Sequence, residues 1–288
     1  MSEDLRPLRS VLYMPGSNER ALEKAKTIPA DALILDLEDA VAPDAKDSAR
    51  ALVCAAVASG AYGGKIVTIR VNGLDSAWHA DDVKAAVAAG PAAIVVPKVN
   101  SAEEVRAIEA SLDAAGAGPQ VAIWAMIESP AAVLHVQEIA AASSRLTTLI
   151  MGTNDLIKEM RGLLTPGRPA LLTPLSMALL GARAAGVAII DGVFMDVKDT
   201  EGLVAECEQG KVMGFDGKTL IHPGQVEPTN EVFSPSAAEI EHAGAVIAAF
   251  DEAVAAGKGV ATLNGKLIEN LHVDEARRVL AFAQALAQ

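Results

Sequence analysis

The stretch Ala32-Leu-Ile-Leu-Asp-Leu-Glu-Asp39 ends a short apolar run with three carboxylates, Asp36, Glu38 and Asp39. A strand buried on both faces is a nearly continuous hydrophobic run, so these charges mark the carboxyl end of a strand. Parallel α/β proteins keep their chemistry at that edge. Strand alternation places Asp36 and Glu38 on one face and Asp39 on the other. Carboxylates this close repel one another unless a cation or an arginine compensates them.

The same order of apolar run, polar residue and alanine-rich segment recurs along the chain. Eight units in roughly 220 residues predict an α/β protein with a (β/α)₈ TIM barrel over residues 1–222. A doubly wound sheet is the alternative, but the turn at residues 14–20 lacks its usual GxGxxG pattern. The expected strands are residues 10–14, 32–37, 65–71, 93–97, 120–127, 147–151, 187–190 and 214–221.

Residues 223–288 are predicted to form a C-terminal helical extension that serves as a lid or an intersubunit arm. Ser236, followed three residues later by Glu239, has the pattern of a capping box at the start of a helix. We expect helices at residues 236–257 and 273–286, separated by a turn-like piece at residues 260–267.

The composition excludes several classes of partner. The formal net charge of −13, from 24 basic and 37 acidic residues, disfavours nucleic acid and anionic membranes. No apolar run approaches the length of a membrane span, and the first residues carry no signal core. Cys54 and Cys207 show no metal-binding spacing, so we expect free thiols in a reducing compartment. These features predict a soluble cytoplasmic protein.

Two sets of basic residues follow expected strands. Arg20 and Lys24 are spaced i, i+4, which suits either a solvated basic edge or a clamp for a phosphate group. Arg70 ends a strand whose polar face also carries Thr68 and Asn72. Its guanidinium needs an anion, which is an internal carboxylate such as Glu38, a substrate carboxylate, or both.

Further polar residues stand at later strand ends. Lys98 is either a Schiff-base nucleophile or a partner of the acidic cluster, and we favour the pairing. Glu128 and Asp155 suit Mg²⁺, which keeps waters and takes one or two protein carboxylates. They also fit an acid/base pair or helix caps. His222 before a proline is either a general base or, more often, a structural histidine.

Seven motifs follow one another along the chain: Arg9-Ser-Val-Leu-Tyr-Met-Pro-Gly, Asp36-Leu-Glu-Asp-Ala-Val, Arg70-Val-Asn, Val96-Pro-Lys, Ile127-Glu-Ser, Gly152-Thr-Asn-Asp and Ile221-His-Pro. With these motifs the chain resembles the citrate lyase β-subunit-like group, the HpcH/HpaI aldolase/citrate lyase family. It is most similar there to malyl-CoA and citramalyl-CoA lyases and to (3S)-malyl-CoA thioesterases. The resemblance implies a modified TIM barrel and a homotrimer or hexamer.

The resemblance also implies roles for individual residues. Glu128 and Asp155 would hold Mg²⁺, and Arg70 would bind the carboxylate of a 2-oxo acid. Glu269, where relatives usually have aspartate, would reach a neighbouring subunit's site as an acid/base. Glu38 and Asp39 would orient Arg70 and the water molecules on the metal. Tyr13, Arg20 and Lys24 would contact the coenzyme A nucleotide. Thr219 and Leu220 would line the substrate channel.

The expected function is a Mg²⁺-dependent lyase that cleaves a malyl-CoA-type thioester to a 2-oxo acid and an acyl-CoA by retro-Claisen chemistry. The alternative is a (3S)-malyl-CoA thioesterase, in which water cleaves the thioester in the same site. A further alternative is a citrate lyase-type subunit that acts on an acyl-carrier protein.

Overall fold

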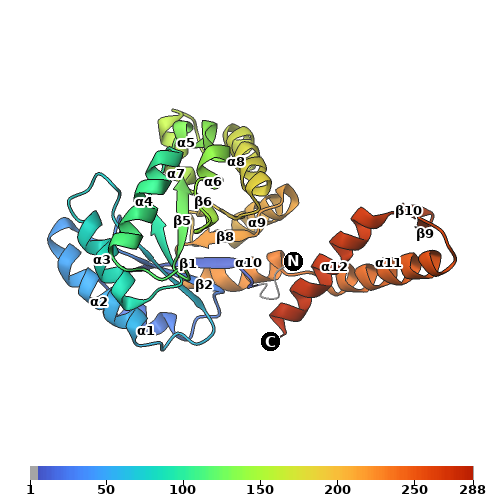
Figure 1. The fold of residues 1–288 in the computed structure, drawn as a ribbon, viewed down its shortest axis with the longest axis horizontal. Coiled ribbons are helices and arrows are strands. Elements are labelled where there is room, and N and C mark those ends of the chain that lie inside the picture. Colours follow the sequence, from blue (N-terminus) through green and yellow to red (C-terminus); the bar gives the residue numbers. More distant parts are fainter. Residues whose placement is uncertain (1–5, 288) are drawn as a thin grey trace. The chain divides into compact units, whose positions relative to one another are not determined.

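Eight parallel strands close into a barrel in the computed structural model, which describes residues 6–287 (Figure 1). Each strand pairs with the next along the chain, and β8 pairs with β1. All eight expected strands are present, so the predicted (β/α)₈ barrel is confirmed. The strands are β1 (Ser10–Pro15), β2 (Ala32–Asp36), β3 (Ile66–Arg70), β4 (Ala93–Val96), β5 (Ala122–Ile127), β6 (Leu146–Met151), β7 (Ala188–Asp191) and β8 (Gly217–Leu220).

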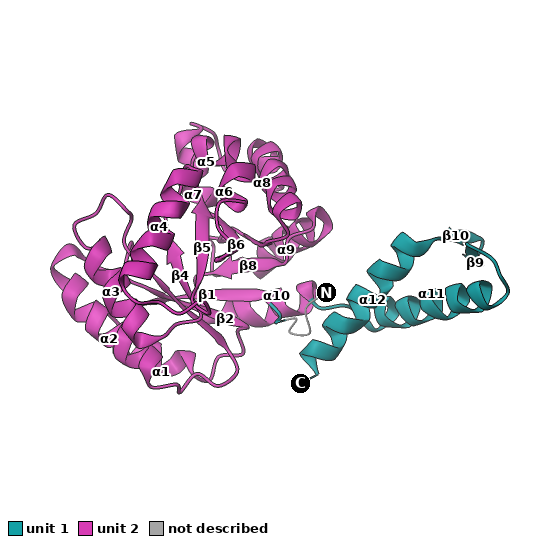
Figure 2. Ribbon diagram, in the orientation of Figure 1, with its two compact units in different colours: residues 1–7, 234–288 teal, residues 8–233 magenta. Residues whose placement is uncertain are grey.

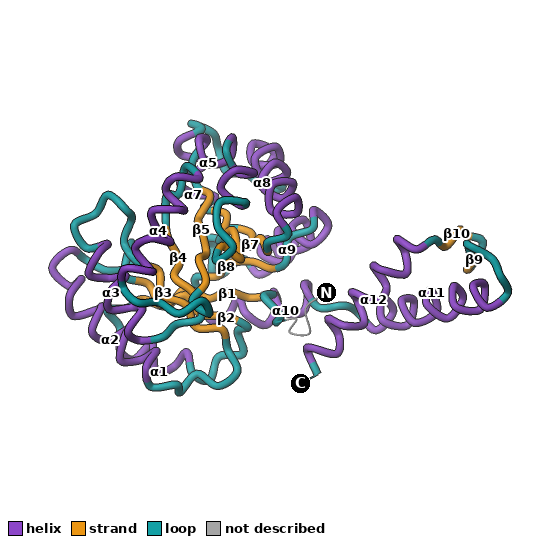
Figure 3. Tube along the Cα trace, in the orientation of Figure 1, coloured by secondary structure: helices purple, strands orange, loops and turns teal. Residues whose placement is uncertain are grey.

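Helices follow the strands and cover the outside of the barrel, as the tube drawing shows (Figure 3). Their many alanines let the helices approach the sheet closely. The helices are α1 (Glu19–Ala25), α2 (Lys46–Ala58), α3 (His79–Ala89), α4 (Ala102–Ala114), α5 (Pro130–Leu134), α6 (Val136–Ala140), α7 (Thr153–Glu159), α8 (Leu172–Ala185), α9 (Thr200–Met213) and α10 (Val226–Phe233), with 3₁₀ turns η1 (Pro43–Ala45), η2 (Pro169–Leu171) and η3 (Pro223–Gln225).

Both faces of each barrel strand are buried, which explains the continuous apolar runs. In β2, Ile34 belongs to the cluster that fills the barrel, whereas Leu33 and Leu35 belong to the cluster under the helices. The strand register also aligns the polar ends. Asp36 pairs with Arg70 on one side and with Pro15 on the other, so these residues meet at one rim.

The segment after β5 forms two short helices. α5 begins at Pro130, with Ser129 as its N-cap, and it ends at His135, after which α6 begins. The break occurs where His135 leaves the helical region, with φ −105° and ψ 11°.

The chain divides into two compact units after Phe233, later than the boundary expected after residue 222 (Figure 2). The reason is that η3 and α10 pack with the barrel: α10 contacts α9, β1 and β8, and Asn230 donates to the carbonyl of Pro29. No helix among the described residues is long and apolar enough to cross a membrane.

The C-terminal unit has its own small core. α11 (Ala237–Ala255) begins with the expected capping box, in which Ser236 and Glu239 exchange hydrogen bonds. The turn-like piece is a two-stranded hairpin of β9 (Ala261–Leu263) and β10 (Lys266–Ile268). Asn264 and Gly265 turn it with φ of 52° and 77°, a conformation that both residue types tolerate. The unit ends with α12 (Asn270–Leu286).

A buried ionic cluster joins β7 and β8 to the elements outside them. Asp191 accepts from Arg168 at 2.8 Å and from Lys218 at 3.0 Å, and Glu206 on α9 accepts from Lys218 at 2.7 Å. Both Lys218 and Asp191 are fully buried. Burial alone would raise the pKa of Asp191, but Lys218 and Arg168 lower it overall.

Asp191→Asn should therefore lower the free energy of unfolding by about 3 kcal/mol, because it leaves two buried cations short of an anion. Urea unfolding at pH 7 measures this loss. Since the folded-state pKa is lowered, this stability is present above about pH 4 and is lost on acidification. Glu103→Gln, in an exposed pair with Arg106, is the control and should change stability little. Equal effects of the two substitutions would contradict the role of the cluster.

Candidate functional site

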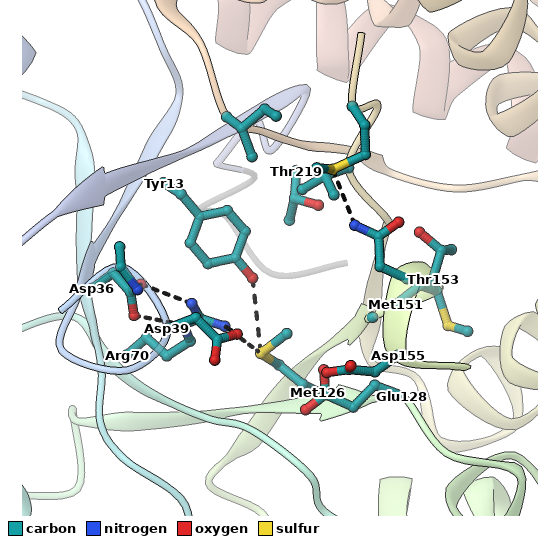
Figure 4. A pocket seen from close by; sticks show the side chains of 16 residues that line it. Tyr13, Asp36, Asp39, Arg70, Met126, Glu128, Met151, Thr153, Asp155 and Thr219 are labelled. Atoms are coloured by element: carbon teal, nitrogen blue, oxygen red, sulfur yellow. Dashed lines mark hydrogen bonds and ion pairs between the residues drawn. The ribbon is translucent and has the colours of Figure 1, made fainter. Parts of the chain in front are cut away.

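A cavity of about 360 Å³ opens at the carboxyl ends of the barrel strands (Figure 4). This is the end at which TIM barrels place their active sites. Acidic, basic, hydroxyl and thioether groups all reach it. It is lined by Tyr13, Asp36, Asp39, Ala40, Arg70, Met126, Glu128, Met151, Gly152, Thr153, Asn154, Asp155, Val193, Met195, Thr219 and Ile221.

Arg70 is held by the acidic cluster that follows β2. Its Nε and Nη2 donate to the two oxygens of Asp36 at 2.6 and 2.7 Å, and its Nη1 lies 2.7 Å from Glu38 and 3.6 Å from Asp39. Burial would raise the pKa of Asp36, but Arg70 lowers it, so this carboxylate stays charged. Burial raises the pKa of Glu38 despite the opposing charge of Arg70. The internal-carboxylate role predicted for Glu38 is therefore present, and Asp36 is the stronger partner.

The chain turns sharply after Asp36, and this turn corrects the predicted orientation of Asp39. The Asp36 carboxylate accepts from the backbone N–H of Glu38 at 2.9 Å and from that of Ala40 at 3.0 Å. Because β2 already ends at Asp36, strand alternation does not extend to Asp39. Asp39 instead lines the cavity together with Asp36.

The buried side chain of Lys46, which was not predicted from the sequence, stabilises this turn by hydrogen bonds. Lys46 Nζ donates to the carbonyls of Leu37 and Glu38 and to Oδ1 of Asn72, each at 2.7 Å. Asn72 follows Arg70 on β3 by two residues, so Lys46 ties the β2 turn to the end of β3. Its signal in the sequence is only a lysine at the start of a helix.

Tyr13 lies inside the barrel mouth. Its ring stacks on Arg70, with the guanidinium carbon 4.9 Å from the ring centre, and its hydroxyl points at Sδ of Met126, 3.8 Å away (Figure 4). Burial raises the pKa of Tyr13 far above its ordinary value, so the phenol stays protonated. The resemblance grouped Tyr13 with Arg20 and Lys24, whereas those two are exposed on α1 and outside the cavity lining.

Glu128 and Asp155 border the cavity from β5 and α7. Oε1 of Glu128 accepts from the backbone N–H of Lys98 at 2.6 Å, and Lys98 adopts a φ of 56° in doing so. Gly152 makes room beside it, because a Cβ there would come within 2.4 Å of Glu128 Oε2. Burial raises the pKa of Glu128 to about 7, with smaller contributions from the Glu38 and Asp155 carboxylates.

This pair fits a divalent cation. A buried carboxylate whose pKa is raised by burial and by neighbouring acids gains most from a nearby positive charge. Within residues 6–287, no three His, Cys, Asp or Glu side chains form a metal cage. A cation bound by Glu128 and Asp155 would therefore need other oxygen ligands, as Mg²⁺ does with water and substrate.

The other predicted residues are placed as follows. Thr219 lines the cavity and donates to the carbonyl of Asp191. The prediction for Leu220 is wrong: it is fully buried among the residues under the helices, and its neighbour Ile221 lines the cavity. The pleat of β8 alternates its side chains, so a position off by one residue falls on the opposite face.

Four more polar residues have defined environments. Lys98 Nζ lies 3.5 Å from Glu38, in agreement with the favoured pairing. His222 Nδ1 accepts from the N–H of Gly224, which is the structural role. Glu269 is exposed in the C-terminal unit at the start of α12, where its N–H bonds to His272 Nδ1, and it is outside the cavity lining. Asp155 is within the first turn of α7, whose N-cap is Gly152, so it is not a helix cap.

The apolar wall of the cavity was not predicted from the sequence. It consists mainly of Met126, Met151, Met195, Val193 and Ile221. Met126 could have been found from its position at the carboxyl end of β5, the end at which TIM barrels place their active sites.

An eight-stranded parallel barrel with charged side chains gathered at its carboxyl mouth is the architecture of a TIM-barrel enzyme. The model of the HpcH/HpaI aldolase/citrate lyase family matches residues 9–223, and the chain belongs to this family.

Known relatives match along nearly the whole chain. A (3S)-malyl-CoA thioesterase of Cereibacter sphaeroides is 52% identical over 100% of this chain and 98% of its own length. The citrate lyase subunit beta of Escherichia coli is 36% identical over 97% and 94%. Among solved structures, CitE of Mycobacterium tuberculosis in complex with magnesium, acetoacetate and coenzyme A has a TM-score of 0.79 at 26% identity, covering 99% of this chain and 100% of that one.

Glu128→Gln should weaken Mg²⁺ binding at least about tenfold, because it removes one of two charged ligands at constant volume. Isothermal titration of the protein with MgCl₂ at pH 8 measures the affinity. In the wild type the affinity should fall below pH 7, where Glu128 takes up a proton. Glu159→Gln, an exposed change on α7, is the matched control. Equal affinities of the two variants would remove Glu128 from the metal site.

Proposed function

We propose that this protein hydrolyses the thioester of a malyl-CoA-type substrate, giving the free hydroxy acid and coenzyme A. The observation that carries the proposal is the 52% identity to a (3S)-malyl-CoA thioesterase over the whole chain. The cavity supports it, since it offers a cation for a carboxylate and a carboxylate pair for a metal on one barrel mouth. This is the alternative weighed from the sequence, and it is now preferred to the lyase.

Arg70 is the residue suited to the substrate carboxylate. Arg70 lines the cavity, and Asp36 accepts from its Nε and Nη2, which fixes the guanidinium plane. Glu38 and Asp39 then limit how far Arg70 can move. A fixed, partly compensated arginine orients an anion without reorganising during the reaction.

Glu128 and Asp155 would hold Mg²⁺ in this proposal. When bound, the ion would act as a Lewis acid toward substrate oxygens. The chain's own contribution is to keep Glu128 immobile through the Lys98 N–H and to supply Asp155 from the first turn of α7.

Hydrolysis also needs a group that takes a proton from the attacking water and returns one to the sulfur as the C–S bond breaks. We assign this role to Glu269, supplied by the C-terminal unit of a neighbouring subunit in a homotrimer or hexamer. Arg20 and Lys24, exposed on α1, are assigned to the phosphates of coenzyme A. The proposed setting is the cytoplasm.

Carbon–carbon cleavage is the second candidate. The specific observation for it is the 36% identity to a citrate lyase β subunit over 97% of this chain. In that reaction the hydroxyl loses its proton, the C–C bond breaks to a 2-oxo acid, and Glu269 protonates the acyl-CoA enolate. The same relative also supports the further alternative that the chain is a citrate lyase-type subunit that acts on an acyl-carrier protein.

Product analysis after incubation of the purified protein with malyl-CoA and Mg²⁺ should give malate and free coenzyme A in equal amounts. Chromatography of the acids and a thiol reagent measure both. Glyoxylate with acetyl-CoA would instead establish the lyase. Lack of turnover on free thioesters, with turnover of an acyl-carrier-protein substrate, would support the subunit alternative. Asp155→Ala is the control and should abolish whichever activity is found.

Glu269→Gln should lower kcat by at least about a hundredfold, because the amide cannot exchange a proton. Mg²⁺ affinity should be unchanged, since Glu269 is not among the proposed metal ligands. Glu252→Gln, an exposed change on α11, provides the matched control. Turnover of the Glu269 variant at the wild-type rate would exclude the acid/base role.

A further inference from the structure

The Tyr13 hydroxyl is the polar tip of a side chain that β1 directs into the barrel mouth. Its only hydrogen-bond partner within residues 6–287 is Sδ of Met126, at 3.8 Å. A thioether is a weak acceptor, and this distance is long for a hydrogen bond. The phenol is therefore a protonated donor whose proton is available to a stronger acceptor.

Arg70 meets the same sulfur. Its Nη1 lies 3.9 Å from Met126 Sδ, while its shorter contacts go to Asp36 and Glu38. Two donors of different strands, β1 and β3, thus converge on one weak acceptor from β5 (Figure 4). Met126 and Glu128 both line the cavity, so the sulfur and the proposed metal ligand belong to the same site.

We propose that Tyr13 is a substrate-binding residue, and that its hydroxyl and Arg70 together donate to one carboxylate of the substrate, near the place where Met126 Sδ now meets both. This rests on the proposed function, in which Arg70 receives that carboxylate. A carboxylate oxygen accepts hydrogen bonds far better than a thioether, so binding would replace two weak contacts by two charge-assisted ones. Tyr13 then binds the carboxylate of the substrate instead of the coenzyme A nucleotide.

Tyr13→Phe isolates the hydroxyl, because it keeps the ring and its stacking on Arg70. Isothermal titration with malate in the presence of Mg²⁺ should show a Kd about tenfold higher than in the wild type, the loss of one hydrogen bond to a charged group. The Kd for free coenzyme A should be unchanged. With malyl-CoA, KM should rise more than kcat falls, which a purely structural role would not produce.

Tyr62→Phe is the matched control, since it also removes a buried phenol hydroxyl, one that donates to the carbonyl of Leu22 and is outside the cavity lining. Its Kd for malate should equal that of the wild type. A malate Kd within twofold of the wild type in Tyr13→Phe would overturn the proposal. So would a weaker affinity for coenzyme A with malate binding intact, which would restore the nucleotide role.

Glyoxylate is titrated in parallel, because either candidate reaction brings a carboxylate to Arg70. If the wild type binds either acid but does not hydrolyse malyl-CoA, only the proposed function fails, and Tyr13→Phe still decides the role of Tyr13. If the wild type binds neither acid, the proposal for Tyr13 is overturned as well.

Discussion

The paired hydrogen bonds between Arg70 and Asp36 are the constraint on which the site depends. The parallel register of β2 and β3 sets these two residues opposite each other at the barrel rim. Removing both charges from water is costly, and the cost is offset only by bidentate geometry and by further partners, here Glu38 and two backbone N–H groups on Asp36. The same contacts that make the pair tolerable also fix the guanidinium plane.

The charges of the cavity are segregated. The strand ends of β2 and β3 carry a compensated cation, and the ends of β5 and β6 lead into two acids, Glu128 and Asp155. Burial, and to a smaller extent the Glu38 and Asp155 carboxylates, raises the pKa of Glu128. Such a cavity favours a ligand that is negative at one end and brings or shares a cation at the other. The apolar wall of the cavity contains three flexible methionine side chains, so it can adapt to substrates of somewhat different shape.

The barrel was predictable because strands buried on both faces must be apolar throughout, as in residues 32–35. Polar residues at strand ends located much of the site for the same reason. Three features were not predictable from pattern alone. The turn after Asp36 is set by hydrogen bonds that the Asp36 carboxylate accepts from later N–H groups, and these end the strand's alternation. The prediction that Leu220 lines the substrate channel was wrong because neighbouring residues of a strand point to opposite faces, and Leu220 points toward the helices. His135 interrupts a helical segment although neither glycine nor proline stands beside it.

The contact between Lys98 and Glu128 uses the main chain, whereas the Lys98 ammonium reaches Glu38. The two duties of this position are thus carried by separable atoms. Its left-handed backbone favours glycine or asparagine as replacements. During evolutionary divergence, a substitution of Lys98 could therefore remove the positive charge beside Glu38 and still keep the backbone N–H that holds the Glu128 carboxylate.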